Sequence, residues 1–271
     1  MRCWLPAWSA LFLTACAAPQ HSLDPAPRYV ALGSSYAAGA GIGPRQPGSP
    51  EQCGRNTNNY ASLLAARLNL SLVDQSCSGA TTAHVLGPWG DLPAQIAAVN
   101  ADTQLVTVTV GGNDVNYMGV VFGASCRAAE QPDCAPAFAP QDSDYARAEA
   151  GLRGIAREVH ARAPGARLVF VQYVRLIGHT LCPAIPIAPA DAATARAVGQ
   201  RLADITARVA SEEDAMLLPL DAASAGHGPC SERPWANGLP ADYAPGDGAP
   251  WHPNAAGHAA AAALLEQLLV R

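Results

Sequence analysis

The sequence predicts an α/β fold in which one parallel β-sheet is covered by helices on both faces. Two observations indicate it: short β-branched runs alternate with segments of helical periodicity, and no linker-like stretch interrupts this alternation. The chain has 271 residues, of which 49% are hydrophobic and 14% are charged. A chain of this size and composition can form one substantial domain with a full core.

Each expected element is defined by its pattern of apolar residues. Apolar runs of strand length occupy 29–32, 70–74, 105–110, 167–173 and 215–220. Helical spacing of apolar residues occurs over 58–68, 145–163, 191–210 and 253–270, with a shorter helix expected over 92–99. The segments without periodicity, which we expect to be loops, are 37–54, 115–139 and 221–251.

The N-terminus has the features of an export signal. Arg2 supplies a positive charge, and residues 5–14 are mostly apolar but too few to span a membrane as a helix. Leu13-Thr14-Ala15-Cys16 resembles the lipobox at which bacterial lipoproteins are cleaved and acylated on the cysteine. Lipidation of Cys16 is therefore expected, and an ordinary secretory signal is the alternative. In both cases the protein is exported.

These features divide the chain into three parts. We expect a lipoprotein-type signal peptide over 1–15, a Pro-containing tether over 16–28 and a single folded domain over 29–271.

Cysteine usage agrees with export. An even set of cysteines in an exported chain is typical of disulfides, here three of them, although the sequence does not choose among the pairings. No pair among them has the spacing of a zinc knuckle, so no metal site is expected. The six are Cys53, Cys77, Cys126, Cys134, Cys182 and Cys230.

The charge of the chain excludes some partners. The formal net charge is -5, the 17 basic residues are all arginine, and no basic stripe is present. Because nucleic acids and anionic membranes are held by clustered basic residues, neither is an expected partner.

Four residues able to take part in catalysis follow the ends of different expected strands. Ser35 comes after the first strand, Gly79 after the second, Asn113 after the third and His252 in the loop after the fifth. The carboxyl ends of parallel strands lie along one edge of a sheet, where ligands bind. We therefore expect these four residues to converge at that edge.

This set suits nucleophilic attack on an acyl group. A serine hydroxyl becomes nucleophilic when a neighbouring imidazole takes its proton, which assigns Ser35 as nucleophile and His252 as base. The oxyanion that follows attack needs preorganised donors, which the N–H groups of Ser35 and Gly79 and the side chain of Asn113 would supply. Such chemistry requires neither a cofactor nor a metal.

Four sequence blocks resemble a known family. Gly33-Ser-Ser-Tyr36, Gly79 within Cys-Ser-Gly-Ala-Thr-Thr, Gly111-Gly-Asn113-Asp and Trp251-His252-Pro-Asn are similar to the four blocks of the SGNH (GDSL) hydrolases, especially the secreted actinobacterial esterase/lipase branch. The resemblance extends from about residue 28 to residue 271. It implies a three-layer flavodoxin-like fold with five parallel strands, and it gives Ser35, Gly79, Asn113 and His252 the same roles.

The resemblance also implies a disulfide pattern. Members of that branch carry three disulfides, which would correspond here to Cys53 with Cys77, Cys126 with Cys134, and Cys182 with Cys230.

Two departures from the family pattern affect the site. Ser34 replaces the aspartate that usually precedes the nucleophile, which concerns the packing of the turn. Ala249 occupies the position, three before the histidine, where the family usually has an aspartate. We expect the main-chain carbonyl of Ala249 to orient His252, and the carboxylate of Asp247 is the alternative.

The leading interpretation is a monomeric serine esterase or lipase that hydrolyses small-molecule or lipid carboxylic esters. Two alternatives are a carbohydrate O-deacetylase of cell-envelope or plant polysaccharide, and an inactive lipoprotein that binds envelope ligands. Trp89 and Trp251 are candidates for lining an acyl pocket, although loop tryptophans more often simply pack. Five other histidines are expected to pack or to make local hydrogen bonds: His84, His160, His179, His227 and His258.

Overall fold

A computed structural model of the protein describes residues 26–244 and 248–270. Its centre is a five-stranded sheet in which all pairs are parallel and the strand order is β2-β1-β3-β4-β5. The predicted parallel α/β fold is thus confirmed. The strands are β1 (Arg28–Gly33), β2 (Ser71–Asp74), β3 (Thr103–Thr109), β4 (Arg167–Val171) and β5 (Met216–Leu218).

The strand order places a crevice at the carboxyl ends of β1 and β3. The chain adds β2 on one side of β1 and then returns past β1 to form β3 on the other side. At such a reversal the two neighbouring crossovers leave on opposite faces of the sheet, which opens a space between their loops.

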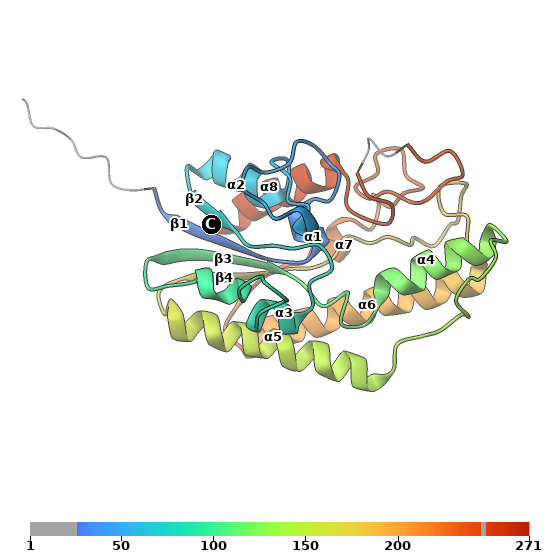
Figure 1. Ribbon diagram of the computed structural model, residues 1–271. Coiled ribbons are helices and arrows are strands. Elements are labelled where there is room, and N and C mark those ends of the chain that lie inside the picture. The colour runs from blue at the N-terminus through green and yellow to red at the C-terminus, as the bar shows by residue number, and fades with distance from the viewer. Residues whose placement is uncertain (1–25, 245–247, 271) are drawn as a thin grey trace, which may run out of the picture.

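Helices cover both faces of the sheet, as Figure 1 shows. Helices α2 and α8 pack together on one face, while α3, α5 and α6 lie on the other, where α4 packs against α6. The helices are α1 (Ser35–Ala38), α2 (Tyr60–Leu68), α3 (Thr82–Leu86), α4 (Tyr117–Ala128), α5 (Asp142–Arg162), α6 (Pro189–Glu212), α7 (Leu220–Ala223) and α8 (Ala255–Leu269), and the short 3₁₀ helices are η1 (Glu51–Cys53) and η2 (Gln95–Ala98).

Helix α4 corrects the expectation of an irregular loop over 115–139. Tyr117, Val120, Val121 and Ala124 are buried at helical spacing on its inner face. Glycines within the helix obscure this pattern in the sequence because glycine disfavours helix interiors, and packing against α6 overrides that preference. The segment over 92–99 forms only the 3₁₀ helix η2, and the loop over 221–251 begins with the last residues of α7.

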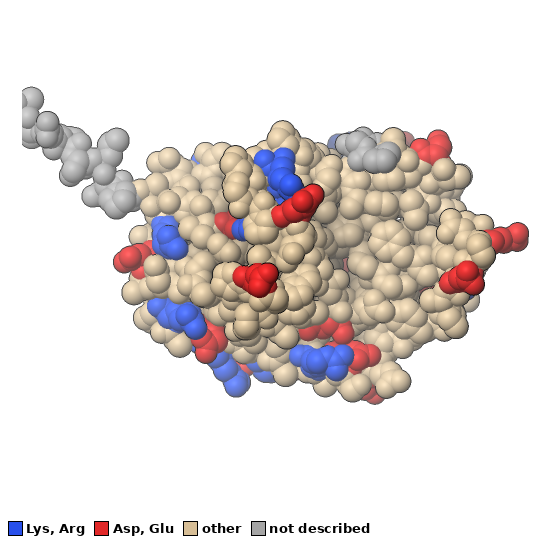
Figure 2. Space-filling view, viewed as in Figure 1, with Lys and Arg blue, Asp and Glu red and all other residues tan. Residues whose placement is uncertain are grey.

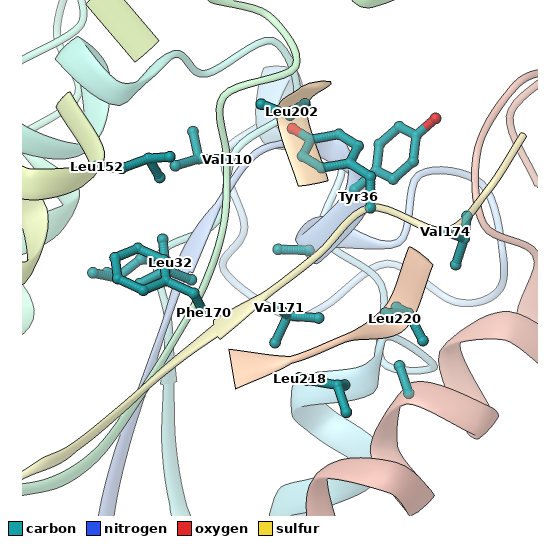
Figure 3. Close-up of a cluster of buried hydrophobic side chains, with 14 of the residues drawn as sticks. Leu32, Tyr36, Val110, Leu152, Phe170, Val171, Val174, Leu202, Leu218 and Leu220 are labelled. Carbon is teal, nitrogen blue, oxygen red and sulfur yellow. The ribbon is translucent and has the colours of Figure 1, made fainter. Parts of the chain in front are cut away.

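The core is built from side chains that alternate between the two faces of the sheet. Phe170 and Val171 are neighbours on β4 and point to opposite sides, as strand geometry requires (Figure 3). Phe170 lies near Leu32 on the side of α5, and Val171 lies near Leu218 on the side of α8. The central strands are therefore buried on both faces, which explains their unbroken apolar sequence.

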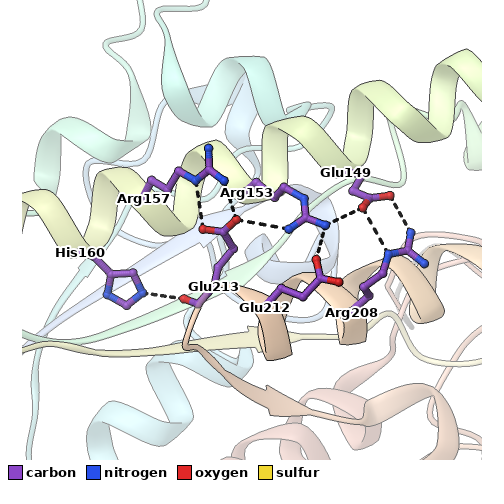
Figure 4. A network of polar contacts seen from close by, with 7 residues as sticks. All are labelled: Glu149, Arg153, Arg157, His160, Arg208, Glu212 and Glu213. Carbon is purple, nitrogen blue, oxygen red and sulfur yellow. Dashed lines mark hydrogen bonds and ion pairs between the residues drawn. The ribbon is translucent and has the colours of Figure 1, made fainter.

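An ion-pair network joins α5 to the end of α6 on the outer surface (Figure 4). Glu149 of α5 accepts hydrogen bonds from Arg153 at 2.8 Å and from Arg208 of α6 at 2.6 Å. Arg153 also pairs with Glu212, and Arg157 binds Glu213 at 2.8 Å. These pairs fix α5 and α6, the two longest helices, relative to each other. The pairs lie away from the carboxyl edge of the sheet.

Within the described ranges, no helix has the length and apolar character needed to cross a membrane. The same residues contain no group of three His, Cys, Asp or Glu side chains arranged to hold a metal ion.

Candidate active site

The turn between β1 and α1 presents Ser35 at the carboxyl edge of the sheet. A Cβ on Gly33 would lie 2.3 Å from the Thr109 carbonyl oxygen, and the Gly33 φ angle is +144°, so only glycine fits there. The Gln95 side chain binds both the N–H of Gly33 at 2.8 Å and its carbonyl at 3.0 Å. Ser34 then occupies the N-cap position of α1, and Ser35 is the first residue of the helix.

Ser35 and His252 are in direct contact, although 217 positions separate them in the sequence. The Ser35 Oγ lies 2.8 Å from the His252 Nε2. The His252 Nδ1 lies 2.7 Å from the carbonyl oxygen of Pro250. Since a carbonyl only accepts hydrogen bonds, Nδ1 carries the proton and Nε2 presents its lone pair to the serine. This is the arrangement of a nucleophile and its general base.

The expectation that the Ala249 carbonyl orients His252 is wrong, because Pro250 does so. The Ala249 carbonyl instead accepts a hydrogen bond from the Asn237 side chain at 3.3 Å. Trp251 adopts a left-handed conformation with φ of 57°, which folds the chain back so that the carbonyl two residues before His252 reaches its ring. The alternative partner, Asp247, lies outside the described residues.

Burial controls the protonation of His252. The side chain is almost completely buried, and this burial lowers the pKa of His252 below its usual value of 6.5, while the hydrogen bond to Pro250 acts in the opposite direction. The imidazole is therefore neutral near pH 7, as a base must be.

Trp251 anchors the loop that carries His252. Its indole is fully buried and donates a hydrogen bond from Nε1 to the Ser125 Oγ of α4 at 3.0 Å. Its carbonyl accepts a hydrogen bond from the Tyr36 hydroxyl at 2.5 Å. A left-handed conformation costs a bulky residue about 1–3 kcal/mol, so it persists only where surrounding contacts enforce it. Trp251 thus packs in the protein interior, as loop tryptophans commonly do.

The three expected oxyanion donors have hydrogen atoms available. Ser35 N–H is at the first position of α1, where an amide has no acceptor within its own helix. Within the described part of the chain, no acceptor is found for Gly79 N–H. One N–H of the Asn113 side chain binds the Ala80 carbonyl at 2.9 Å, which orients the amide and leaves its second hydrogen unused.

Neighbouring groups hold the turn at Gly79. Gly79 has a φ angle of +85°, and a Cβ there would lie 3.1 Å from the ring of Trp89. The preceding residue, Ser78, donates from both its N–H and its hydroxyl to the Cys53 carbonyl, at 3.0 and 2.9 Å. Together with these hydrogen bonds, the disulfide between Cys53 and Cys77 fixes the segment just before Gly79.

All three disulfides join the pairs that the family resemblance implies: Cys53 with Cys77, Cys126 with Cys134, and Cys182 with Cys230.

Tyr173 connects the serine turn to the Asn113 loop and was not predicted from the sequence. Its hydroxyl accepts a hydrogen bond from Gly112 N–H at 3.0 Å and lies 3.1 Å from the Ser34 Oγ. Burial raises the pKa of Tyr173 to about 12, so the hydroxyl keeps its proton and can donate it to Ser34. Tyr173 lies two residues past the end of β4, and its position at the carboxyl end of that strand was the signal that could have identified it.

The replacement of aspartate by Ser34 leaves the turn intact. Ser34 is buried, its N–H donates to the Thr109 carbonyl at 2.9 Å, and its hydroxyl contacts Tyr173. Tyr36 completes this arrangement, since its ring centre is 4.3 Å from that of Tyr173 and 4.8 Å from that of His252.

Other polar residues, both near the site and away from it, have structural partners. Asp114 accepts hydrogen bonds from the N–H and hydroxyl of Thr82, and burial raises the pKa of this carboxyl. His258 is buried in α8, where its Nδ1 accepts from Tyr60 N–H at 3.1 Å. His84 and His227 stack on tryptophan rings, and His160 binds the Glu213 carbonyl.

Comparison with known proteins agrees with this geometry. The profile of the GDSL-like Lipase/Acylhydrolase family matches residues 31–260. The chain is 31% identical to Lipase 2 of Streptomyces coelicolor over 261 residues, covering 90% of this chain and 86% of that protein. It belongs to the GDSL-like lipase/acylhydrolase family. As a member of this family, it is a serine hydrolase that acts on carboxylic ester bonds.

Solved structures of similar proteins share the fold. A crystal structure of an extracellular lipase from Streptomyces rimosus has a TM-score of 0.72 at 26% identity, and one of a phospholipase A1 from Streptomyces albidoflavus has a TM-score of 0.71 at 25% identity. Both comparisons cover 89% of this chain and 99% of the other. The five-stranded fold of this GDSL-family hydrolase is therefore that of its relatives.

The Tyr173 hydroxyl provides a test of how the donor loop is positioned. We expect Tyr173→Phe to lower kcat about three- to tenfold with little change in KM, because one hydrogen bond of about 0.5–1.5 kcal/mol no longer holds Gly112 beside Asn113. Steady-state kinetics on a soluble ester measures both constants. Tyr29→Phe is the matched control, since it removes a buried hydroxyl bonded to Thr107, away from the site. An equal loss of kcat in both variants would contradict a positioning role for Tyr173.

Proposed function

We propose that this hydrolase cleaves acyl esters of lipids through an acyl-enzyme intermediate on Ser35. The observation that carries the proposal is the 2.8 Å contact between Ser35 and a histidine held by a main-chain carbonyl. No metal or cofactor takes part in this mechanism.

The reaction proceeds in two halves. In the first, the Ser35 Oγ attacks the ester carbonyl carbon while the His252 Nε2 takes its proton, which gives a tetrahedral oxyanion. Collapse of this intermediate breaks the ester C–O bond, and His252 returns the proton to the departing alkoxide. In the second half, water attacks the acyl-Ser35 ester with His252 again as base, releasing the carboxylic acid and free Ser35.

Three donors stabilise the oxyanion in both halves. The N–H groups of Ser35 and Gly79 and the free hydrogen of the Asn113 side chain are the assigned donors. Because the site is buried and preorganised, each donor contributes strongly, and removal of one typically raises the barrier by about 2.7–4 kcal/mol.

The Pro250 carbonyl takes the place of a catalytic carboxylate. It fixes the His252 tautomer and accepts the Nδ1 proton, but as a dipole it stabilises the imidazolium less than a full negative charge would. We therefore assign a catalytic dyad of Ser35 and His252, supported by the Pro250 carbonyl, instead of a triad with Asp247.

The names of the similar proteins favour lipid esters over acetylated carbohydrates as substrates. Among the proteins similar to this chain in sequence and structure are named lipases and a phospholipase A1. The only feature that favours an inactive ligand-binding protein is Ser34, which stands where the family usually has an aspartate. The hydrogen bonds that Ser34 makes to Thr109 and Tyr173 remove that argument.

A chain-length series of p-nitrophenyl esters tests the function. We expect hydrolysis that extends beyond the acetyl ester, and a loss of at least about a thousandfold in kcat for Ser35→Ala, as for the removal of a catalytic serine. Equal activity in Ser35→Ala would contradict the serine mechanism. Activity confined to the acetyl ester would indicate a deacetylase.

Export is proposed together with this function. The N-terminal signal pattern and three disulfides support it, as does the description of a relative as an extracellular lipase. We expect mass spectrometry of the protein purified from its native host to find Cys16 as a lipidated first residue. An unmodified N-terminus beyond residue 16 would instead indicate free secretion.

A further inference from the structure

The N–H of Gly79 belongs to the central peptide group of a tight turn. Ala80 N–H binds the Cys77 carbonyl at 3.0 Å, which closes a β-turn over 77–80. Gly79 has a φ angle of +85°, whereas the φ angle of Ser78 is not positive. The turn is therefore of type II, with glycine as its third residue. Within the described ranges, neither Gly79 N–H nor the Ser78 carbonyl has a hydrogen-bond partner.

Hydrogen bonds hold both ends of this turn but not its central peptide. Ser78 N–H binds the Cys53 carbonyl at 3.0 Å, and the Asn113 side chain binds the Ala80 carbonyl at 2.9 Å. A half-rotation of the central peptide converts a type II turn into type I, and glycine accepts the φ angle of either form. Such a rotation would reverse the direction of Gly79 N–H. Packing must therefore select the orientation in which this N–H can donate to the oxyanion.

Trp89 packs on the side of Gly79 where a side chain would project. A Cβ on Gly79 would lie 3.1 Å from the edge of the Trp89 indole, and its three nearest neighbours are all atoms of that ring. In a type II turn this is the side of the central carbonyl, and the N–H points to the opposite side. After rotation, Gly79 N–H would face the indole edge, which has no acceptor. A buried donor without an acceptor is unfavourable, so the ring stabilises the type II form.

Local contacts fix the Trp89 ring in turn. His84 stacks on it with ring centres 4.3 Å apart and planes 2° from parallel. The His84 Nδ1 accepts a hydrogen bond from Thr81 N–H at 3.2 Å, which ties the stack to the first turn of α3. Trp89 and Leu92 exchange two main-chain hydrogen bonds of 3.0 Å. Uncharged side chains make up most of the surface around α3 (Figure 2), so packing and main-chain bonds hold this assembly.

We propose that Trp89 is a positioning residue for the oxyanion donor of Gly79. Its ring holds the turn over 77–80 in the type II form, in which Gly79 N–H is directed at the reacting carbonyl. The proposal rests on the proposed function, since it takes Gly79 as a donor. Trp89 acts through Gly79 and not on the substrate. A donor that is fixed in advance stabilises the oxyanion without reorienting during the reaction.

Paired substitutions in the full purified protein test this role. Trp89→Ala frees the central peptide to rotate. Because complete loss of one oxyanion donor lowers kcat about 10²–10³-fold, we expect partial rotation to lower kcat about tenfold on p-nitrophenyl butyrate, with little change in KM. Leu92→Ala is the matched control, since Leu92 packs against the same buried cluster but lies beyond the three nearest neighbours of the Gly79 Cβ position. Both variants should lower the melting temperature, and only Trp89→Ala should lower kcat.

A thiono ester provides a readout that a general loss of stability would not change. Sulfur is a weak hydrogen-bond acceptor, so a thiono ester gains less from the oxyanion donors than the ordinary ester does. The ratio of kcat for p-nitrophenyl butyrate to kcat for its thiono analogue therefore measures how well the donors are placed. We expect this ratio to fall several-fold in Trp89→Ala and to stay at the wild-type value in Leu92→Ala. Trp89→Phe, which keeps a ring against Gly79, should restore most of it.

The outcomes separate this inference from the proposed function. If Trp89→Ala loses no more kcat than Leu92→Ala, or loses it equally on both esters, the positioning role is overturned and the serine mechanism stands. If Trp89→Ala does not fold, the same ratio measured for Trp89→Leu decides the question. Activity retained by Ser35→Ala would instead show that the proposed function itself is wrong.

Discussion

Burial of the Trp251 side chain holds the last loop of the protein against the sheet, and the catalytic geometry depends on it. The residue has an unfavourable left-handed backbone that brings the Pro250 carbonyl to the His252 ring. Contacts with Ser125 and Tyr36 offset this cost, since both ends of Trp251 are hydrogen-bonded inside the protein. Without this anchor, His252 would have neither a fixed tautomer nor a fixed distance from Ser35.

The two central tyrosines extend that anchor across the sheet edge. Tyr36 joins the serine helix to the histidine loop, and Tyr173 joins the serine turn to the Asn113 loop. Their rings lie against each other with centres 4.3 Å apart. The proposed nucleophile, base and oxyanion donors thus come from distant parts of the chain but are held by one continuous set of buried contacts. Such preorganisation lets the donors meet the oxyanion without rearranging.

The sequence predicted the placement of those candidate site residues whose positions depend on strand ends. Ser35, Gly79 and Asn113 follow consecutive strands of a parallel sheet, and sheet geometry alone brings them to one edge. Tyr173 follows the same rule and was missed only because the end of β4 was not considered as a source of site residues.

Features that depend on local backbone geometry were not accessible from the sequence. Sequence position favoured Ala249 as the partner of His252, but the left-handed turn at Trp251 shifts this role by one residue to Pro250. Helix α4 was missed because glycines weaken its helical signal. In both cases tertiary packing overrides a local preference.

The carbonyl-supported dyad is tested most directly by the pH dependence of kcat/KM for the wild type and Asp247→Asn. In the proposed mechanism neutral imidazole is the base, so activity is lost as the pH falls through the His252 pKa, which burial lowers below 6.5. We expect an acid limb below pH 6.5 in both proteins and nearly equal plateau rates. A loss approaching the roughly 10⁴-fold seen on neutralising a triad aspartate would show that a carboxylate, and not the Pro250 carbonyl, supports the base.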